Sequence, residues 1–150
     1  MLIAALFAAT SAQPPDYTKF VNPFIGTKET GHTFPGATAP FSLVQPSPDT
    51  GDNGWAYTGG YQYADTEILG FSNTHLSGVG VPDLGDILLQ PFTGDLPRSN
   101  FRSGYEKSSE KAAPGYYGVY LRDFDVRVEL TASERVAFHR YVFETDKSQH

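Results

Sequence analysis

The stretch DVRVELTASERVAFHRYVFE, residues 125–144, decides the fold class. Within it Val126, Val128 and Leu130 alternate with polar side chains, and apolar residues alternate again over residues 135–144. Successive side chains of a β-strand point to opposite faces, so a period of two predicts strands with one buried face. The four residues ASER, 132–135, separate the two runs and predict the connection of an antiparallel hairpin.

Short apolar runs on the N-terminal side of this hairpin indicate more strands of the same kind. They are FSLVQ (41–45), EILGFS (67–72), DILLQPF (86–92) and YYGVYLR (116–122). Each is bounded by Gly, Pro, Asp or Asn, as strands are. No stretch after the first dozen residues shows a convincing helical period. Several short strands at regular spacing predict an all-β fold, an antiparallel β-sandwich or barrel.

The first residues, MLIAALFAATSAQ, are apolar from Leu2 to Ala9 and then small. This pattern predicts a secretory signal peptide over residues 1–12, although the positive charge usual at its start is missing. A buried N-terminal helix is the alternative, and the two prolines at 14–15 would end it. The run is too short to cross a membrane as a mature helix, and no transmembrane segment is expected after it. We therefore expect a secreted, periplasmic or cell-surface protein.

The composition excludes several classes of function. The 150 residues are 39% hydrophobic and 14% aromatic, which indicates one folded domain with a core. A net charge of −6 without a basic stripe argues against a nucleic-acid partner. The chain has no Cys, so a metal would need His or oxygen ligands. A weak calcium signal, without EF-hand spacing, comes from Asp49, Asp52 and Asn53.

Two long loops carry candidate binding residues. The first, residues 21–40, has Gly and Pro around His32, which is either a ligand contact or a turn histidine bonded to a local carbonyl. The second, residues 46–65, holds the only Trp, Trp55, among Tyr and Asp residues. Aromatic faces stack on sugar rings while nearby polar groups bind hydroxyls, so this loop suits a carbohydrate pocket. The alternative is that Trp55 and Tyr61 pack in the core.

A third Gly-rich stretch, FSNTHLSGVGVPDLGDILLQP (71–91), contains His75, Asp83 and Asp86. In principle a His and carboxylates form a metal site or an acid–base pair. The only plausible His partner near the same loops is His32, and an Asp at a strand entry commonly caps its own backbone amides. A structural turn is therefore the better interpretation of this spacing.

Together these loops resemble glycoside hydrolase family 92, the calcium-dependent exo-acting α-mannosidases. The strings that carry the resemblance stand in the family's order: VNPFIGT (21–27), GHTFPGATAPF (31–41), QPSPDT (45–50) and GFSNTHLSGVGVPDLGDILLQP (70–91). The similarity is specific from Tyr17 to Leu96 and weaker from Arg98 onward. It implies an N-terminal antiparallel β-sandwich followed by a larger (α/α)6 barrel. Residues 13–150 would be the truncated sandwich, with the catalytic barrel absent.

The resemblance also implies hydrolysis of terminal α-mannosides with inversion. In that reaction one carboxylic acid protonates the leaving oxygen, and a carboxylate about 6.5–9.5 Å away activates water. Family members keep both carboxylates and most calcium ligands in the helical domain, so we assign no catalytic residue and no metal ligand here and expect the fragment alone to be inactive. Trp55 matches a Trp beside the bound sugar, whereas His32 and His75 match positions near the domain interface. We expect these three residues to bind a mannose-containing glycan.

Two other classes of function stay open. One is a free-standing, non-catalytic carbohydrate-binding β-sandwich, and the other is a scaffold that docks a helical partner through its Phe and Tyr side chains. The sequence downstream of His150 separates them from the enzyme. A long continuation rich in amphipathic helices favours the mannosidase, and an immediate stop favours a free-standing module.

Overall fold

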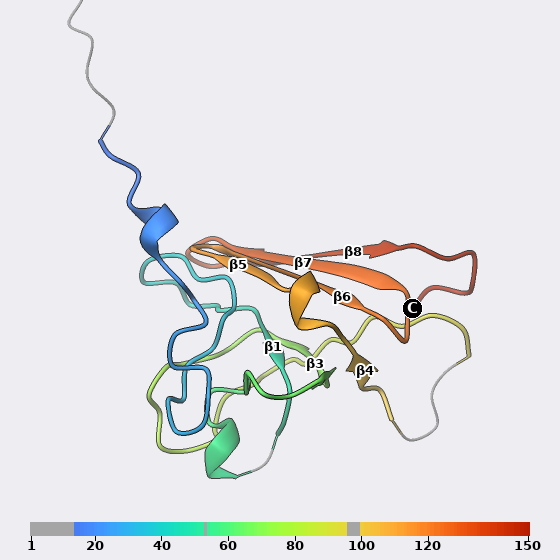
Figure 1. The fold of residues 1–150 in the computed structure, drawn as a ribbon, viewed down its shortest axis with the longest axis horizontal. Helices are drawn as coiled ribbons and strands as arrows, with labels where there is room; N and C mark the ends of the chain where they lie inside the picture. The colour runs from blue at the N-terminus through green and yellow to red at the C-terminus, as the bar shows by residue number, and fades with distance from the viewer. Residues whose placement is uncertain (1–13, 53, 96–99) are drawn as a thin grey trace, which may run out of the picture.

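The structure, a computed structural model, describes residues 14–52, 54–95 and 100–150. The predicted signal peptide, residues 1–12, lies outside the described residues. Two layers of antiparallel strands pack face to face, with a four-stranded sheet along one side and short strands below it (Figure 1). The described residues contain three short 3-10 turns and no α-helix, so the all-β prediction is confirmed.

The large sheet is a meander of four strands in chain order. They are β5 (Lys111–Ala113), β6 (Tyr116–Leu121), β7 (Val126–Ala132) and β8 (Ala137–Phe143). The three runs predicted over residues 116–144 are therefore strands, and ASER lies in the predicted connection, where the Ser133 amide donates to the Val136 carbonyl at 2.9 Å. β5 was not predicted, because KAA has no apolar alternation.

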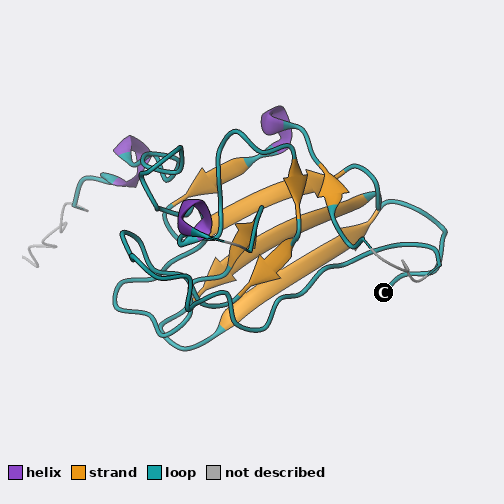
Figure 2. Cartoon of the chain, turned by 90° about the horizontal axis from the view of Figure 1, so that it is seen from below, coloured by secondary structure: helices purple, strands orange, loops and turns teal. Residues whose placement is uncertain are grey.

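The second layer consists of two separate strand pairs. β1 (Ser47–Asp49) pairs with β3 (Gly70–Ser72), and β2 (Glu67–Ile68) pairs with β4 (Ser103–Gly104). The predicted EILGFS strand is thus real but is divided between the two pairs at Leu69. Figure 2 shows these short strands crossing in front of the long strands of the large sheet. Three 3-10 turns complete the elements: η1 (Thr18–Phe20), η2 (Trp55–Tyr57) and η3 (Lys107–Ser109).

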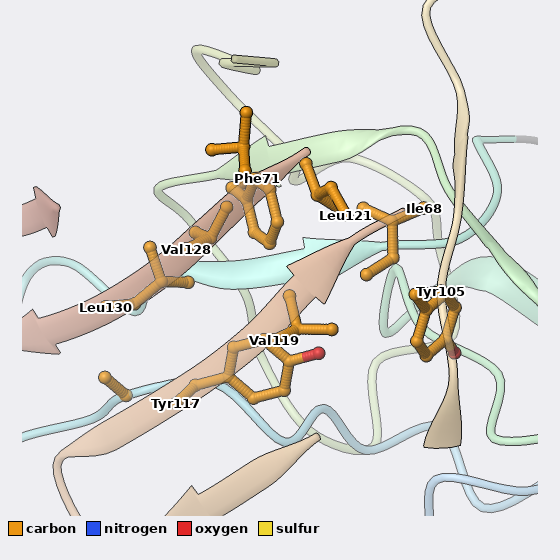
Figure 3. Packing of buried hydrophobic residues seen from close by; sticks show 10 residues of the cluster. Ile68, Phe71, Tyr105, Tyr117, Val119, Leu121, Val128 and Leu130 are labelled. Atoms are coloured by element: carbon orange, nitrogen blue, oxygen red, sulfur yellow. The ribbon is translucent and has the colours of Figure 1, made fainter. Parts of the chain in front are cut away.

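The core lies between the two layers. The alternation that predicted β7 places Val126, Val128 and Leu130 inside, each at most 1% exposed. Ile68 and Phe71 of the short strands pack against this face of the sheet (Figure 3). A continuous apolar cluster contributed by both layers is what stabilises a β-sandwich. The described part of the chain has no helix long and apolar enough to cross a membrane.

Two predicted strands are wrong. Residues 41–45 form a loop in which Phe41 has a left-handed backbone (φ 57°) and the Leu43 amide donates to the Glu134 carbonyl of the β7–β8 connection. Residues 86–92 form only a single bridge, Phe71 to Leu89, because Ile87 also has a left-handed backbone (φ 56°) that breaks the ladder. In both runs the apolar pattern resembles a strand while the backbone turns.

Candidate functional site

Trp55 opens η2, which lies at the end of the molecule away from the four-stranded sheet (Figure 1). Gly54 before it has φ 76°, a left-handed conformation that glycine adopts without strain. Trp55 is 59% exposed, so the alternative that it packs in the core is wrong, whereas Tyr61 is 1% exposed and does belong to the interior. An exposed indole on a turn held by the fold is suited to contact a ligand.

Two other loops hold the indole. The imidazole of His32 lies with its ring centroid 4.7 Å from that of Trp55 and its plane at 74°, an edge-to-face contact. On the 71–91 loop, a Cβ built on Gly80 would lie 3.5 Å from Cζ3 of the indole, so the glycine backbone borders Trp55. The three loops singled out from the sequence therefore meet at one residue, Trp55.

His32 is buried, at 7% exposure, and has a left-handed backbone with φ 50°. Its Nδ1 lies 2.9 Å from Oγ1 of Thr58, the residue that ends η2. Its carbonyl accepts the Gly78 amide at 2.8 Å, which ties it to the third loop. The side chain is thus bonded to Thr58, not to a local carbonyl. Its Nε2 is buried and has no hydrogen-bond partner among the described residues.

His75 lies in a separate buried network. Nε2 is 2.9 Å from Oδ1 of Asp49 and 3.1 Å from Oγ of Ser72, and Nδ1 is 2.8 Å from the Gln45 carbonyl. Both ring nitrogens therefore lie within hydrogen-bonding distance of oxygen atoms, the Asp49 carboxylate among them. Oδ2 of Asp49 accepts the Ser72 amide at 2.9 Å across the β1–β3 pair.

This trio of Ser, His and Asp is not a nucleophilic triad. In a triad the two ring nitrogens are divided between the hydroxyl and the carboxylate, whereas here both groups meet the same Nε2. Ser72 is also completely buried. The network joins the start of the third loop to β1. The carboxylate that pairs with His75 is that of Asp49, 26 residues earlier in the chain.

Asp83 and Asp86 lie in an irregular loop, to which no turn is assigned. Asp86 accepts a hydrogen bond from the Thr74 hydroxyl at 2.9 Å, and its carbonyl accepts the Asn73 amide at 3.0 Å. Both side chains belong to exposed residues and neither is bonded to His75. The structure therefore separates the two carboxylates from the histidine that the sequence placed beside them.

Two residues that shape this region, Thr58 and Gly60, were not predicted as site residues. Gly60 has φ 78°, and a Cβ there would lie 2.3 Å from Oδ1 of Asp49 and 3.0 Å from Nε2 of His75. Only a residue without a side chain fits against the buried pair. The GG pair at 59–60 after an aromatic run was the available signal, since adjacent glycines mark a backbone with positive φ or a close approach.

A second polar cluster lies beneath η3. The carboxylate of Glu110, 2% exposed, accepts hydroxyl hydrogen bonds from Tyr61 at 2.9 Å and Tyr117 at 2.7 Å and pairs with Lys107 at 3.2 Å. Burial raises the pKa of Tyr61 above its usual range, and the nearby carboxylate raises it further. Burial lowers the pKa of Lys107, which the Glu110 charge opposes. With every group partnered, this cluster is a structural element of the fold.

A polar cavity of about 340 Å³ lies beside η2 and is lined in part by Tyr57, Asp65 and Arg102. The Tyr57 hydroxyl donates to Asp65 at 3.1 Å, and burial followed by that charge raises the pKa of Tyr57. The Arg102 guanidinium donates to the Thr50 carbonyl at 2.7 Å. Within residues 14–52, 54–95 and 100–150, no three His, Asp or Glu side chains are grouped so that they could hold a metal ion. The described residues thus hold no cluster of carboxylates of the kind that calcium sites use, and Asn53 of the weak calcium signal lies outside the described residues.

Comparison with known proteins identifies the family. The glycosyl hydrolase family 92 N-terminal domain matches residues 20–150. The chain is 30% identical over 137 residues to an uncharacterized secreted glycosidase of Arthroderma benhamiae, covering 85% of this chain and 17% of that protein. Among solved structures it is similar to the family GH92 α-mannosidase BT3965 of Bacteroides thetaiotaomicron, with 41% identity, a TM-score of 0.80, and coverage of 84% of this chain and 18% of the other.

The inverting mannosidase BT2199 of the same bacterium is also similar, with 28% identity, a TM-score of 0.74, and coverage of 93% of this chain and 19% of the other. The chain spans about a fifth of the length of each of these relatives. The match over residues 20–150 covers the three loops around Trp55 and both strand layers. The chain therefore belongs to glycosyl hydrolase family 92, in which it corresponds to the N-terminal domain.

Proposed function

We propose that this chain is the N-terminal part of a glycosidase that hydrolyses terminal α-mannosides with inversion. Its membership of the family supports the reaction class, and the two mannosidases to which it is similar support the substrate. The domain packs on a helical catalytic domain that supplies the acid and the base. Calcium is held mainly by that other domain, as the resemblance to the family implies.

The observation that carries a role in the sugar pocket is the exposed indole of Trp55. An aromatic side chain that is 59% exposed and is held by contacts with His32 and Gly80 offers a preorganised surface to a sugar ring. A non-catalytic carbohydrate-binding β-sandwich would bind sugar through the same exposed indole, so this function is the second candidate. The two candidates differ in whether Trp55 affects turnover or only binding.

For His75 we propose a supporting role in place of contact with the glycan. It is 3% exposed and its polar atoms are satisfied by Asp49, Gln45 and Ser72, so no donor is left for a sugar hydroxyl. Holding the third loop against β1 is the function that this geometry supports.

The test is steady-state kinetics of the full-length enzyme on an aryl α-mannoside and a mannobiose. Trp55→Ala should lower kcat/KM by about ten- to a hundredfold, which corresponds to the loss of about 1.4–2.7 kcal/mol of transition-state stabilisation from stacking and burial of the ring. Phe41→Ala is the control, since Phe41 is likewise an exposed aromatic residue but is not among the residues that contact Trp55. Equal kinetics for wild type and Trp55→Ala would rule out the pocket role.

Secretion is a further part of the proposal. The apolar residues 1–12 are typical of a signal peptide, and the relative from Arthroderma benhamiae is described as secreted. N-terminal sequencing of the protein purified from the culture medium or periplasm tests it. A start at or near residue 13 is expected, and an intact Met1 in the exported protein would exclude cleavage.

A further inference from the structure

The buried Nε2 of His32 requires an explanation. A polar atom removed from water without a hydrogen bond costs about 1–3 kcal/mol, so such atoms are uncommon in folded proteins. The other ring nitrogen, Nδ1, is held by the Thr58 hydroxyl, which fixes the orientation of the imidazole. The aromatic neighbour of the ring is Trp55, at 4.7 Å and 74°.

The backbone of His32 adds a second observation. Its φ of 50° lies in the left-handed region, where Asn is favoured among residues with a side chain and His is also enriched. If the position served only the turn, Asn or Gly would satisfy it at less cost. The ring must therefore contribute something that the turn does not require.

We infer that His32 is the positioning residue for Trp55, and that it orients the indole for stacking on the terminal sugar ring of the substrate. This inference rests on the proposed pocket role of Trp55. Thr58 ends η2 and bonds to Nδ1, so one side chain connects the two ends of the turn that begins with Trp55. Gly80 borders the indole from another loop. Both contacts restrict the indole, which is still 59% exposed and so accessible to a ligand.

The experiment uses two variants of the full-length enzyme. His32→Asn keeps a left-handed backbone and an amide that reaches Thr58, but it removes the ring beside the indole. Thr58→Val keeps the shape of residue 58 and the imidazole, but it removes the bond to Nδ1. Phe41→Ala is the control outside the cluster.

The readouts are kinetics and the ¹⁹F spectrum of enzyme labelled with 5-fluorotryptophan, in which Trp55→Phe identifies the resonance of residue 55. His32→Asn should broaden or shift that resonance and lower kcat/KM by roughly three- to tenfold, with KM carrying most of the change. Thr58→Val should do the same to a smaller extent. Melting temperatures within a few degrees of wild type would show that the fold is intact.

Two results overturn the inference separately from the proposed function. If Trp55→Ala impairs the enzyme while His32→Asn and Thr58→Val leave the residue 55 resonance and KM unchanged, Trp55 contacts sugar but His32 does not position it. If the resonance moves in both variants while Trp55→Ala has normal kinetics, His32 orients an indole that the substrate does not use, and the proposed pocket role fails. Should His32→Asn not fold, Thr58→Val decides alone.

Discussion

Replacing Gly60 by Ala tests the buried pair of Asp49 and His75 directly. The new Cβ would lie 2.3 Å from Oδ1 of Asp49, so the carboxylate must move by about 1 Å to reach an ordinary contact distance. That shift breaks the 2.9 Å bond to His75 and strains the 2.9 Å bond from the Ser72 amide. Both bonds involve a charged group, and each contributes about 1.5–3 kcal/mol.

The backbone adds a separate cost, because Gly60 has φ 78° and a residue with a side chain pays about 1–2 kcal/mol there. Gly60→Ala should therefore destabilise the β1–β3 region by about 3–5 kcal/mol in all. Gly78→Ala is the matched control, since Gly78 has φ 75° and nothing within 4 Å of its hypothetical Cβ. The control should lose only the backbone term, about 1–2 kcal/mol.

The assay is amide hydrogen exchange of Ser72 in the full-length protein, because that amide is bonded to Asp49 and reports local opening. Gly60→Ala should reduce its protection by about 30- to 150-fold relative to Gly78→Ala, the ratio for a difference of about 2–3 kcal/mol. Equal protection in the two variants would refute the reasoning, since it would mean that the carboxylate relaxes without loss of its bonds.

Three further predictions concern the core and the large sheet, measured by thermal unfolding. Glu110→Ala should cost about 3–5 kcal/mol, because it leaves two buried tyrosine hydroxyls and a lysine without their acceptor; a loss below 1 kcal/mol would show that water replaces the carboxylate. Leu130→Ala should cost about 2–5 kcal/mol, whereas Val142→Ala on the outer face of β8, already 38% exposed, should cost less than about 1 kcal/mol. Burial lowers the pKa of His139, so the folded state favours the neutral imidazole. The free energy of unfolding should therefore be highest above about pH 7 and fall as the pH drops below about 6.5. His139→Gln should make this pH dependence weaker.

The hairpin over residues 126–143 could be predicted because the sequence pattern that specifies it lies within the hairpin itself. Alternation with a period of two is a property of neighbouring residues, and the register places Val128 opposite Tyr141 and Glu129 opposite Arg140 as such a hairpin requires. The predicted strands at 41–45 and 86–92 failed for a reason that is also local but that an apolar pattern does not contain. Phe41 and Ile87 take left-handed backbones, which aromatic and β-branched residues rarely do.

The sequence allowed us to predict which loops carry the candidate site, but it did not allow us to predict the hydrogen-bond partners of their side chains. Sequence separation hid the partner of His75, because Asp83 and Asp86 are near in the chain while the true partner, Asp49, is 26 residues away. The bond from Tyr61 to Glu110 spans 49 residues and was invisible for the same reason. Such pairs form only after the two layers pack, so no local period or spacing encodes them.

The two histidines show how loops without regular secondary structure can still hold a fixed conformation. Loops without a strand ladder must satisfy their polar groups by other means, and buried side chains serve that purpose here. His75 ties the third loop to β1 through Asp49, and His32 ties the first loop to η2 through Thr58. Forming each bond requires that polar groups lose their hydration, and the bond then fixes the relative position of the two segments. That geometry leaves Trp55 exposed to solvent, and an indole held by two other loops would lose less conformational entropy on binding the proposed sugar ligand than a free side chain would.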